Sequence, residues 1–307
     1  MCRNKQLIPH LALHGLAAYK AFMKFYIMNG AGNRFGVFDA REHAGFVMTA
    51  DLAKATAAPN GPMGKLGADQ IIIMRPPKTE IAKTENADVF MEIWNADGAE
   101  VDACGNASRC IPWLVMNETG RDKVMLETNA GLLQARRTNE FSVAVDMGEP
   151  RLEWDEIPLK EYMDTRVIDV KVGPIDAPIL ARPGAVNMGN PHCVFFVDDA
   201  EAVAADKIGP MIEYHPLFPQ QCNVGFAEIR SRSEIRLRVW ERGAGLTKAC
   251  GTGACAALVA ANRQNRTDRK ARIIMDGGDL HIEWRESDNH VIMTGPVELE
   301  FEGELEV

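Results

Sequence analysis

Hydrophobic residues recur along this 307-residue chain in short runs that alternate with polar positions or end at turn-forming residues. Runs of this length, bounded by glycine, proline, asparagine or aspartate, are typical of β-strands. In the first half the pattern predicts strands at 23–27, 36–39, 70–74, 89–94, 124–128, 132–135 and 141–146. In the second half it predicts strands at 193–197, 224–229, 235–240, 272–275, 280–284 and 291–293.

Four other segments have a helix-compatible composition, at 50–58, 106–117, 200–207 and 250–262. The last is rich in small residues, which suits burial inside a strongly curved sheet. Pro112 lies inside the second, where it costs about 3 kcal/mol in a regular helix, so we expect a kink or a short helix there. Strands do not alternate strictly with long helices, and no Gly-x-Gly-x-x-Gly motif follows a strand. The pattern therefore predicts an α+β fold and argues against a dinucleotide-binding one.

Two stretches of the chain read alike. In each, a strand-like run ends in tryptophan, at Trp94 and at Trp240, and Ala-Cys-Gly follows with its cysteine ten positions later, at Cys104 and Cys250. Equivalent positions are 146 residues apart. Self-similarity at a fixed offset indicates copies of one structural unit. We predict two pseudo-symmetric domains, each a strongly curved mixed sheet or barrel wrapped around a central helix.

The end of the chain has no counterpart in the first half. Residues 297–307 alternate as a half-buried strand does, and we infer that this strand returns to the N-terminal domain. The predicted division is 23–150 plus 297–307 for the N-terminal domain and 151–296 for the C-terminal domain. Residues 1–22 are expected to be a dispensable extension, because their loosely apolar run is interrupted by Pro9, His10 and His14, unlike a signal peptide.

Composition argues against several classes of function. The 43 acidic residues exceed the 34 basic ones, and no basic block suggests a surface for nucleic acid. No apolar run approaches the roughly 18 residues of a membrane-spanning helix, so no membrane association is expected. The seven cysteines include no C-x-x-C pair and are odd in number. We therefore expect reduced thiols in the cytoplasm, no disulfide framework and no metal site.

The two duplicated cysteines are candidates for chemistry. Each falls where a loop turns into a helix, and the unsatisfied N–H groups there favour a thiolate or a ligand carboxylate. If the two halves face each other, one thiolate could remove the proton beside a bound carboxylate while the other thiol delivers one to the opposite face. This pair would invert a stereocentre. Polar residues of the neighbouring loops could fix a polar amino acid, namely Asn33, Asn95, Asn190, Asn223, Glu241 and Arg242.

A cysteine by itself is more often a small buried hydrophobe than a catalyst. We apply that interpretation to Cys2, Cys110, Cys193, Cys222 and Cys255. His192, at the start of a strand, is equally open to an ordinary structural role. Duplication at equal spacing from tryptophan is what distinguishes Cys104 and Cys250.

The motifs around these residues resemble those of the diaminopimelate epimerase family, over nearly the whole chain from Met23. They are Asn95-Ala96-Asp97-Gly98, Ala103-Cys104-Gly105-Asn106, Gly189-Asn190-Pro191-His192, Glu241-Arg242-Gly243-Ala244-Gly245 and Ala249-Cys250-Gly251-Thr252-Gly253. The resemblance implies an epimerase that needs neither pyridoxal phosphate nor metal and has its active site in the cleft between two domains. It implies interconversion of LL- and meso-diaminopimelate in lysine and peptidoglycan precursor biosynthesis. It also suggests a homodimer.

The resemblance implies a role for each motif residue. Cys104 and Cys250 would be the two bases, and His192 and Glu241 would support proton transfer or substrate orientation. The small-molecule amino-acid substrate would be held by Asn33, Gln70, Asn95, Asn190, Asn223, Glu241 and Arg242. The carboxylate at the reacting centre would be bound by Gly105, Asn106, Gly251 and Thr252.

Two positions depart from the family pattern. The first glycine-rich segment, Asn29-Gly30-Ala31-Gly32-Asn33-Arg34-Phe35, matches a further motif of the family, in which an acidic residue is usual at the position of Arg34. This puts the charge beside Asn33 in question. Ala107 stands where glycine is usual. Relatives of other specificity remain as alternatives. A proline racemase or hydroxyproline epimerase would usually have histidine in place of Asn106 and aspartate in place of Glu241, and a histidine-type racemase on the same scaffold is left open.

Functions of other classes fit less well. A thiol redox or metal-binding protein is disfavoured by the lack of a C-x-x-C pair. A catalytically inactive binding protein on this fold would be expected to lose one of the two cysteines, and both Cys104 and Cys250 are present.

Overall fold

The computed structural model describes residues 22–174 and 176–306. Contacts divide the chain into two compact units, Met1–Val143 with Val297–Val307, and Ala144–Pro296. The first unit ends a few residues before position 150, because the segment around Asp146 is bonded into the second unit. The Asp146 carboxylate pairs with Arg285 and His290, and the Met147 N–H donates to the Val291 carbonyl at 2.8 Å. The extension at 1–22 lies outside the described residues, except for Phe22.

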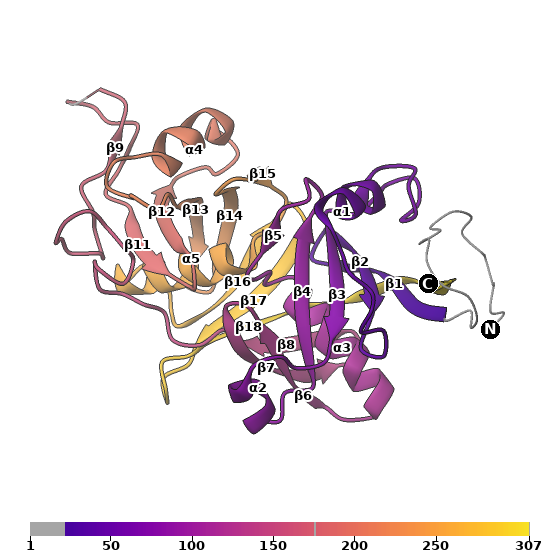
Figure 1. The fold of residues 1–307 in the computed structure, drawn as a ribbon. Coiled ribbons are helices and arrows are strands. Elements are labelled where there is room, and N and C mark those ends of the chain that lie inside the picture. The colour runs from indigo at the N-terminus through magenta and orange to yellow at the C-terminus, as the bar shows by residue number, and fades with distance from the viewer. Residues whose placement is uncertain (1–21, 175, 307) are drawn as a thin grey trace. The chain divides into compact units, whose positions relative to one another are not determined.

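The first unit is a mixed sheet that packs against one long helix (Figure 1). Its helices are α1 (Ala50–Ala57), α2 (Glu80–Thr84) and α3 (Ala107–Thr119). Its strands are β1 (Phe22–Gly30), β2 (Asn33–Asp39), β3 (Gln70–Arg75), β4 (Val89–Asn95), β5 (Glu100–Val101), β6 (Lys123–Thr128), β7 (Gly131–Asn139) and β19 (Glu298–Glu306), and β8 (Ser142–Asp146) spans the boundary between the units. Strand β19, from the end of the chain, pairs antiparallel with β1. Helix α3 packs against β1, β6 and β7.

The second unit encloses its long helix more completely. Its helices are α4 (Ala205–Glu213) and α5 (Gly251–Arg263). Its strands are β9 (Lys171–Val172), β10 (Leu180–Ala181), β11 (Gly184–Asn187), β12 (Pro191–Val197), β13 (Asn223–Ser231), β14 (Glu234–Glu241), β15 (Gly245–Thr247), β16 (Lys270–Met275), β17 (Gly278–Trp284) and β18 (Val291–Pro296). Helix α5 contacts β11 to β14 and β16 to β18, and its alanines are buried. A large side chain would not fit among so many strands, which explains the small-residue composition of this helix.

The strands of the two units pair in the same order. In the first unit, β1–β2 is antiparallel, β2–β3 parallel, β3–β4 antiparallel, β4–β6 parallel and β6–β7 antiparallel. In the second, β11–β12 is antiparallel, β12–β13 parallel, β13–β14 antiparallel, β14–β16 parallel and β16–β17 antiparallel. The long helix enters at the same point in each order, between β5 and β6 or between β15 and β16. The prediction of a mixed α+β fold is confirmed.

A tight hairpin brings the first glycine-rich segment to the start of α3. Ala31 and Gly32, between β1 and β2, both have positive φ, at 52° and 85°, which is the conformation of a two-residue type I′ turn. Gly30 lies so close to α3 that a Cβ there would be 3.0 Å from the Asn106 carbonyl oxygen. Glycine at this position therefore allows β1 to approach the loop that carries Cys104.

One predicted helix is wrong in its position. The sequence indicated 200–207, but α4 is Ala205–Glu213. The reason is local, because the Asp199 carboxylate accepts hydrogen bonds from the N–H groups of Glu201 and Ala202, at 2.8 and 3.3 Å. Such side-chain bonds satisfy backbone donors in a turn and compete with helix formation. Pro112, in contrast, is accommodated within the 13 residues of α3.

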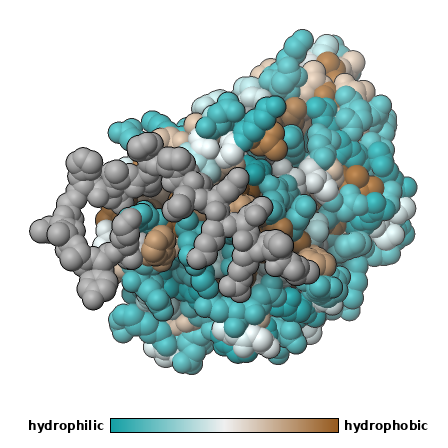
Figure 2. Space-filling model, turned by 90° about the vertical axis from the view of Figure 1, so that its right-hand side faces the viewer, coloured by the Kyte–Doolittle hydropathy of each residue, from teal (hydrophilic) through white to brown (hydrophobic). Residues whose placement is uncertain are grey.

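Hydrophilic residues predominate on the molecular face drawn in Figure 2, and the apolar ones on it are scattered. Among the described residues, none of the helices combines the length and apolar composition needed to cross a bilayer.

Candidate functional site

Cys104 lies in the loop that leads into α3. Its sulfur accepts a hydrogen bond from the Ala107 N–H at 3.5 Å, and its carbonyl accepts from the Ser108 N–H at 3.0 Å. The side chain is half-buried. These two bonds use the N–H groups of the third and fourth residues after the cysteine. The N–H groups of Gly105 and Asn106, which come before them, lie at the N-terminal end of the helix, where backbone donors have no acceptor within the helix.

Amide side chains of the first unit form two hydrogen-bonded pairs, and Asn106 of one pair belongs to this loop. Asn106 is buried, donates from Nδ2 to Oδ1 of Asn33, and accepts from the Arg109 guanidinium at 3.0 Å. Gln70 donates to Oδ1 of Asn95 at 2.8 Å, because the two residues are partners in the register of β3 and β4. The structure therefore links the predicted residues of this unit in two pairs, Asn33 with Asn106 and Gln70 with Asn95.

Cys250 occupies the corresponding position in the second unit and is the N-cap residue of α5. Its sulfur accepts from the Gly253 N–H at 3.3 Å and lies 3.6 Å from the Thr252 hydroxyl, and its carbonyl accepts from the Ala254 N–H at 2.9 Å. The side chain is only 3% exposed. Burial, reinforced by the neighbouring Glu241 carboxyl, holds the pKa of this thiol well above its usual range. Cys250 is therefore protonated at neutral pH.

Glu241 ends β14 beside Cys250. It accepts a hydrogen bond from the Thr247 hydroxyl at 2.6 Å. Burial raises its pKa, although the bonds with Thr247 and Cys250 act in the opposite direction. A buried carboxyl that touches a thiol can exchange a proton with it or orient it.

His192 is buried at the start of β12. Its Nε2 pairs with Oδ1 of Asn190 at 2.9 Å. Burial lowers its pKa to about 3, with a smaller contribution from Arg242. The imidazole is therefore neutral at physiological pH, which favours a role in orienting Asn190 over one in supplying a proton.

Asn223 and Arg242 lie in adjoining strand ends. Asn223 donates from Nδ2 to the Pro191 carbonyl at 3.2 Å and accepts the Arg242 backbone N–H at 3.0 Å. The Arg242 guanidinium is exposed and uses Nη1 for the Gln220 carbonyl at 2.9 Å. A guanidinium has five N–H donors, so this bond leaves others for a ligand.

The strand registers give each polar residue of one unit a counterpart in the other. Phe35 pairs with Gln70 as His192 pairs with Asn223, which places Asn33 and Asn190 at equivalent positions. Gln70 and Asn223 are likewise equivalent. Gln70 pairs with Asn95. Val224, which follows Asn223, pairs with Trp240, so the register places Asn223 opposite Glu241. Asn95 and Glu241 are therefore equivalent, directly after Trp94 and Trp240. In each unit, therefore, the predicted residues lie at the ends of equivalent strands and at the start of the equivalent helix.

The Arg34 side chain forms its ion pair and hydrogen bonds within the first unit. Its Nε pairs with Glu300 of β19 at 2.7 Å, and its Nη1 donates to the carbonyl oxygens of Met63 and Gly67. Its backbone N–H donates to the Asp69 carboxylate at 2.7 Å. This cation therefore joins a surface loop to β19, which answers the question that the sequence raised about charge beside Asn33.

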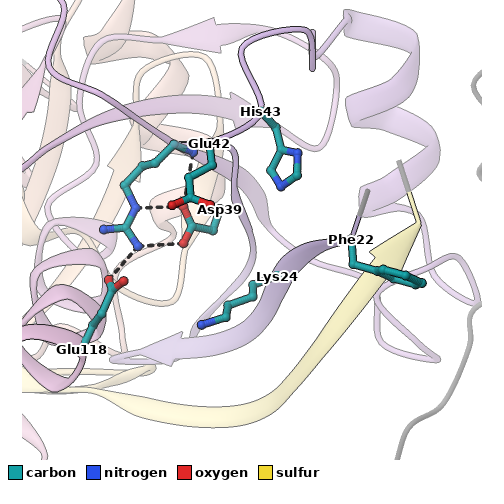
Figure 3. A pocket seen from close by; sticks show the side chains of 7 residues that line it. Phe22, Lys24, Asp39, Glu42, His43 and Glu118 are labelled. Carbon is teal, nitrogen blue, oxygen red and sulfur yellow. Dashed lines mark hydrogen bonds and ion pairs between the residues drawn. The ribbon is translucent and has the colours of Figure 1, made fainter. Parts of the chain in front are cut away.

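A cavity of about 260 Å³ in the first unit lies elsewhere (Figure 3). Its lining includes Asp39, Arg41 and Glu118, and Glu118 is near the far end of α3 from Cys104. Arg41 forms ion pairs with both acids, at 2.7 Å to Asp39 and 2.6 Å to Glu118. None of the predicted site residues lines this cavity, and we do not assign the chemistry to it.

Sequence reasoning missed one residue of the second half-site. Glu213, at the end of α4, is buried and accepts hydrogen bonds from the Trp240 indole and the Gly243 backbone N–H. A partly buried tryptophan near the end of a strand needs an acceptor for its indole N–H, and that need was the available signal.

These half-sites define a class of protein, namely a duplicated α+β fold that carries one cysteine at the start of the long helix in each unit. Comparison with solved structures agrees on the fold. A hydroxyproline epimerase from Agrobacterium vitis superposes with a TM-score of 0.63 over 93% of each chain, at 16% sequence identity.

Comparison of sequences defines the family. The family model described as diaminopimelate epimerase matches residues 25–153 and 184–300. The diaminopimelate epimerase of Phenylobacterium zucineum is 53% identical, over 92% of this chain and 97% of its own. That of Caulobacter vibrioides is 50% identical, over 92% and 96%. The chain belongs to the diaminopimelate epimerase family.

Proposed function

We propose that this protein is an isomerase that interconverts LL- and meso-diaminopimelate by proton transfer between two thiols, without a cofactor. The observation that carries the proposal is the repeated geometry of Cys104 and Cys250 in a chain of this family. Each thiol accepts the N–H of the third residue after it, and each cysteine carbonyl accepts the N–H of the fourth. Repetition of this geometry at both helix starts is difficult to explain by packing alone.

The reaction needs one base and one acid on opposite faces of the α-carbon. One cysteine, as thiolate, takes the α-proton and becomes a thiol, and the electron pair left on carbon is stabilised by the adjacent carboxylate. The other cysteine, as thiol, donates its proton to the opposite face and becomes a thiolate. The raised pKa of Cys250 makes it the donor in one direction of the reaction, and microscopic reversibility makes it the base in the other.

The carboxylate at the reacting centre would be bound by backbone N–H groups. In the first unit these are the N–H groups of Gly105 and Asn106, and in the second those of Gly251 and Thr252. These N–H groups lie at the N-terminal end of a helix and have no acceptor within it, so they favour binding of an anion. Electrostatic stabilisation of the carbanion would come from the same groups.

The far end of the substrate would be read by the polar residues of the two half-sites. Arg242 is suited to the distal carboxylate, because its planar fork can form two parallel bonds. Asn33, Gln70, Asn95, Asn190 and Asn223 would bind the ammonium groups and the remaining carboxylate oxygens. His192 would orient Asn190, and Glu241 would exchange a proton with Cys250 or hold it in place.

Because the reaction requires one thiolate and one thiol, we propose a reducing compartment, the cytoplasm, as its location. The products would serve lysine and peptidoglycan precursor synthesis.

The proposal is tested by kcat/KM for LL-diaminopimelate beside lysine, proline, glutamate and histidine, with no cofactor added. A site that hydrogen-bonds a distal carboxylate rejects an analogue lacking it by about 10⁴-fold. We therefore expect diaminopimelate to exceed lysine by orders of magnitude. A value for any of the four that equals or exceeds the value for diaminopimelate would overturn the substrate assignment.

A further inference from the structure

Glu213 is a buried acid that makes two hydrogen bonds, one with each carboxylate oxygen. It is the last residue of α4 and is 2% exposed. Its Oε2 accepts the Trp240 indole N–H at 2.7 Å, and its Oε1 accepts the Gly243 backbone N–H at 2.9 Å. A carboxylate accepts hydrogen bonds and donates none, so both of its oxygens are matched to donors here.

These two donors lie on either side of Glu241 and Arg242. Trp240 directly precedes Glu241 in β14, and Gly243 directly follows Arg242 in the turn to β15. The turn is closed by a bond from the Ala244 N–H to the Glu241 carbonyl at 3.0 Å, and Gly243 supplies the positive φ of 72° that it requires. One side chain thus fixes both ends of the dipeptide that the proposed mechanism uses.

Helix α4 reaches this position only because it carries glycine where it meets the tryptophan. A Cβ on Gly209 would lie 2.3 Å from Cγ of Trp240, a distance that real side chains do not tolerate. The close approach of α4 brings the Glu213 carboxylate within bonding distance of the turn. The packing and the hydrogen bonds therefore support the same placement.

The corresponding tryptophan of the first unit is held differently. Trp94 donates its indole N–H at 2.7 Å to Glu92, which lies two residues earlier on its own strand, β4. That bond is local to the strand, whereas the bond of Trp240 joins β14 to a helix. This contrast provides a matched control.

We propose that Glu213 is a positioning residue that sets the orientation of Arg242 for substrate binding. This inference rests on the proposed function. Glu213 acts through the turn and does not itself contact the substrate.

The test begins with Glu213→Gln, which keeps the size of the side chain. Its amide nitrogen must face one of the two N–H donors, so one bond is replaced by a donor–donor contact. Loss of one charge-assisted bond corresponds to about a tenfold or larger effect. We expect kcat/KM for LL-diaminopimelate to fall by about tenfold or more, mainly through KM, because Arg242 is the group displaced. Glu92→Gln alters the local bond of Trp94 and also the ion pair of Glu92 with Arg75, and it is expected to change KM by less than about threefold.

A double-mutant cycle with Arg242→Lys separates positioning from general damage to the fold. If Glu213 acts through Arg242, the double variant is no worse than Arg242→Lys alone, because the two changes remove one shared interaction. Multiplicative losses would contradict the inference. Should Glu213→Gln fail to fold, Trp240→Phe removes one donor and leaves the Gly243 bond, and a smaller rise in KM is expected.

Amide hydrogen exchange gives a readout that needs no substrate. Exchange of the peptide containing Arg242 and Gly243 should be faster in Glu213→Gln than in the wild type or Glu92→Gln. Faster exchange in an enzyme that does not turn over diaminopimelate would mean that the proposed function has failed while the structural role of Glu213 stands. Unchanged exchange together with an unchanged KM in an active enzyme would overturn the inference.

Discussion

The two half-sites share a backbone and differ in chemistry. In the first unit, the position after the tryptophan is Asn95, whose partner is the amide of Gln70. In the second, that position is Glu241, whose partners are the Thr247 hydroxyl and Cys250. Cys104 is half-buried in a loop where Gly105 and Asn106 accept hydrogen bonds from the Arg109 guanidinium, whereas Cys250 is buried beside a carboxyl. Duplication has thus kept the frame that places a thiol at a helix start and has let the neighbours of the two thiols diverge.

This difference has a chemical meaning. A proton transfer between two faces needs one group that accepts a proton and one group that donates a proton, so the two groups start in different protonation states. Two identical environments would give two equal thiols, whereas unequal neighbours favour one thiol and one thiolate. The divergence of the half-sites is therefore consistent with the proposed reaction.

The largest expected effect is loss of either thiol. Cys104→Ala and Cys250→Ala should each lower epimerisation by about 10³-fold or more, since an acid or base contributes about 10²–10⁴-fold and neither half can replace the other. Turnover is measured with LL-diaminopimelate, and circular dichroism confirms the fold. Near wild-type turnover by either variant would refute the two-thiol assignment.

A smaller effect concerns stability and one histidine. Because the pKa of His192 is about 3 in the folded protein and about 6.5 when unfolded, the unfolded chain binds a proton in this window that the folded protein does not. Stability contributed by the neutral imidazole is thus present above pH 6.5 and is lost as the pH falls towards 3, by roughly 1.4 kcal/mol per pH unit.

Urea unfolding of the wild type and His192→Gln between pH 4 and pH 8 measures this contribution. The variant should lose less stability than the wild type on acidification. Parallel losses in the two proteins would show that His192 does not titrate in this way.

Not all of this organisation was available from the sequence. The repeat, the strand pattern and both cysteines follow from local signals, because periodicity and turn residues act within a few positions. The partners of Arg34 do not, since Glu300 is distant in the chain and is reached only through the pairing of β19 with β1. Glu213 was missed because its partners, Trp240 and Gly243, are also distant in the chain and are reached only through the packing of α4. Helix α4 was misplaced because the Asp199 turn bonds are a property of one side chain rather than of a pattern.

The smallest expected effect is a difference in reactivity between the two thiols. Iodoacetamide at neutral pH should label Cys104 several-fold faster than Cys250, because Cys104 is half-buried while Cys250 is buried and its pKa is raised. Peptide mass spectrometry measures the order, with the buried Cys255 as an internal reference. Faster labelling of Cys250 would reverse the assignment of the two environments.

The central claim is that protons pass between solvent, thiols and the α-carbon without a cofactor. It is tested most directly by incubating the purified protein with LL-diaminopimelate in D₂O and following the α-proton signal by NMR. The account predicts deuterium at the α-carbon of the meso product, formed without added pyridoxal phosphate and abolished in both Cys→Ala variants. Formation of meso product without deuterium, or only after pyridoxal phosphate is added, would contradict it.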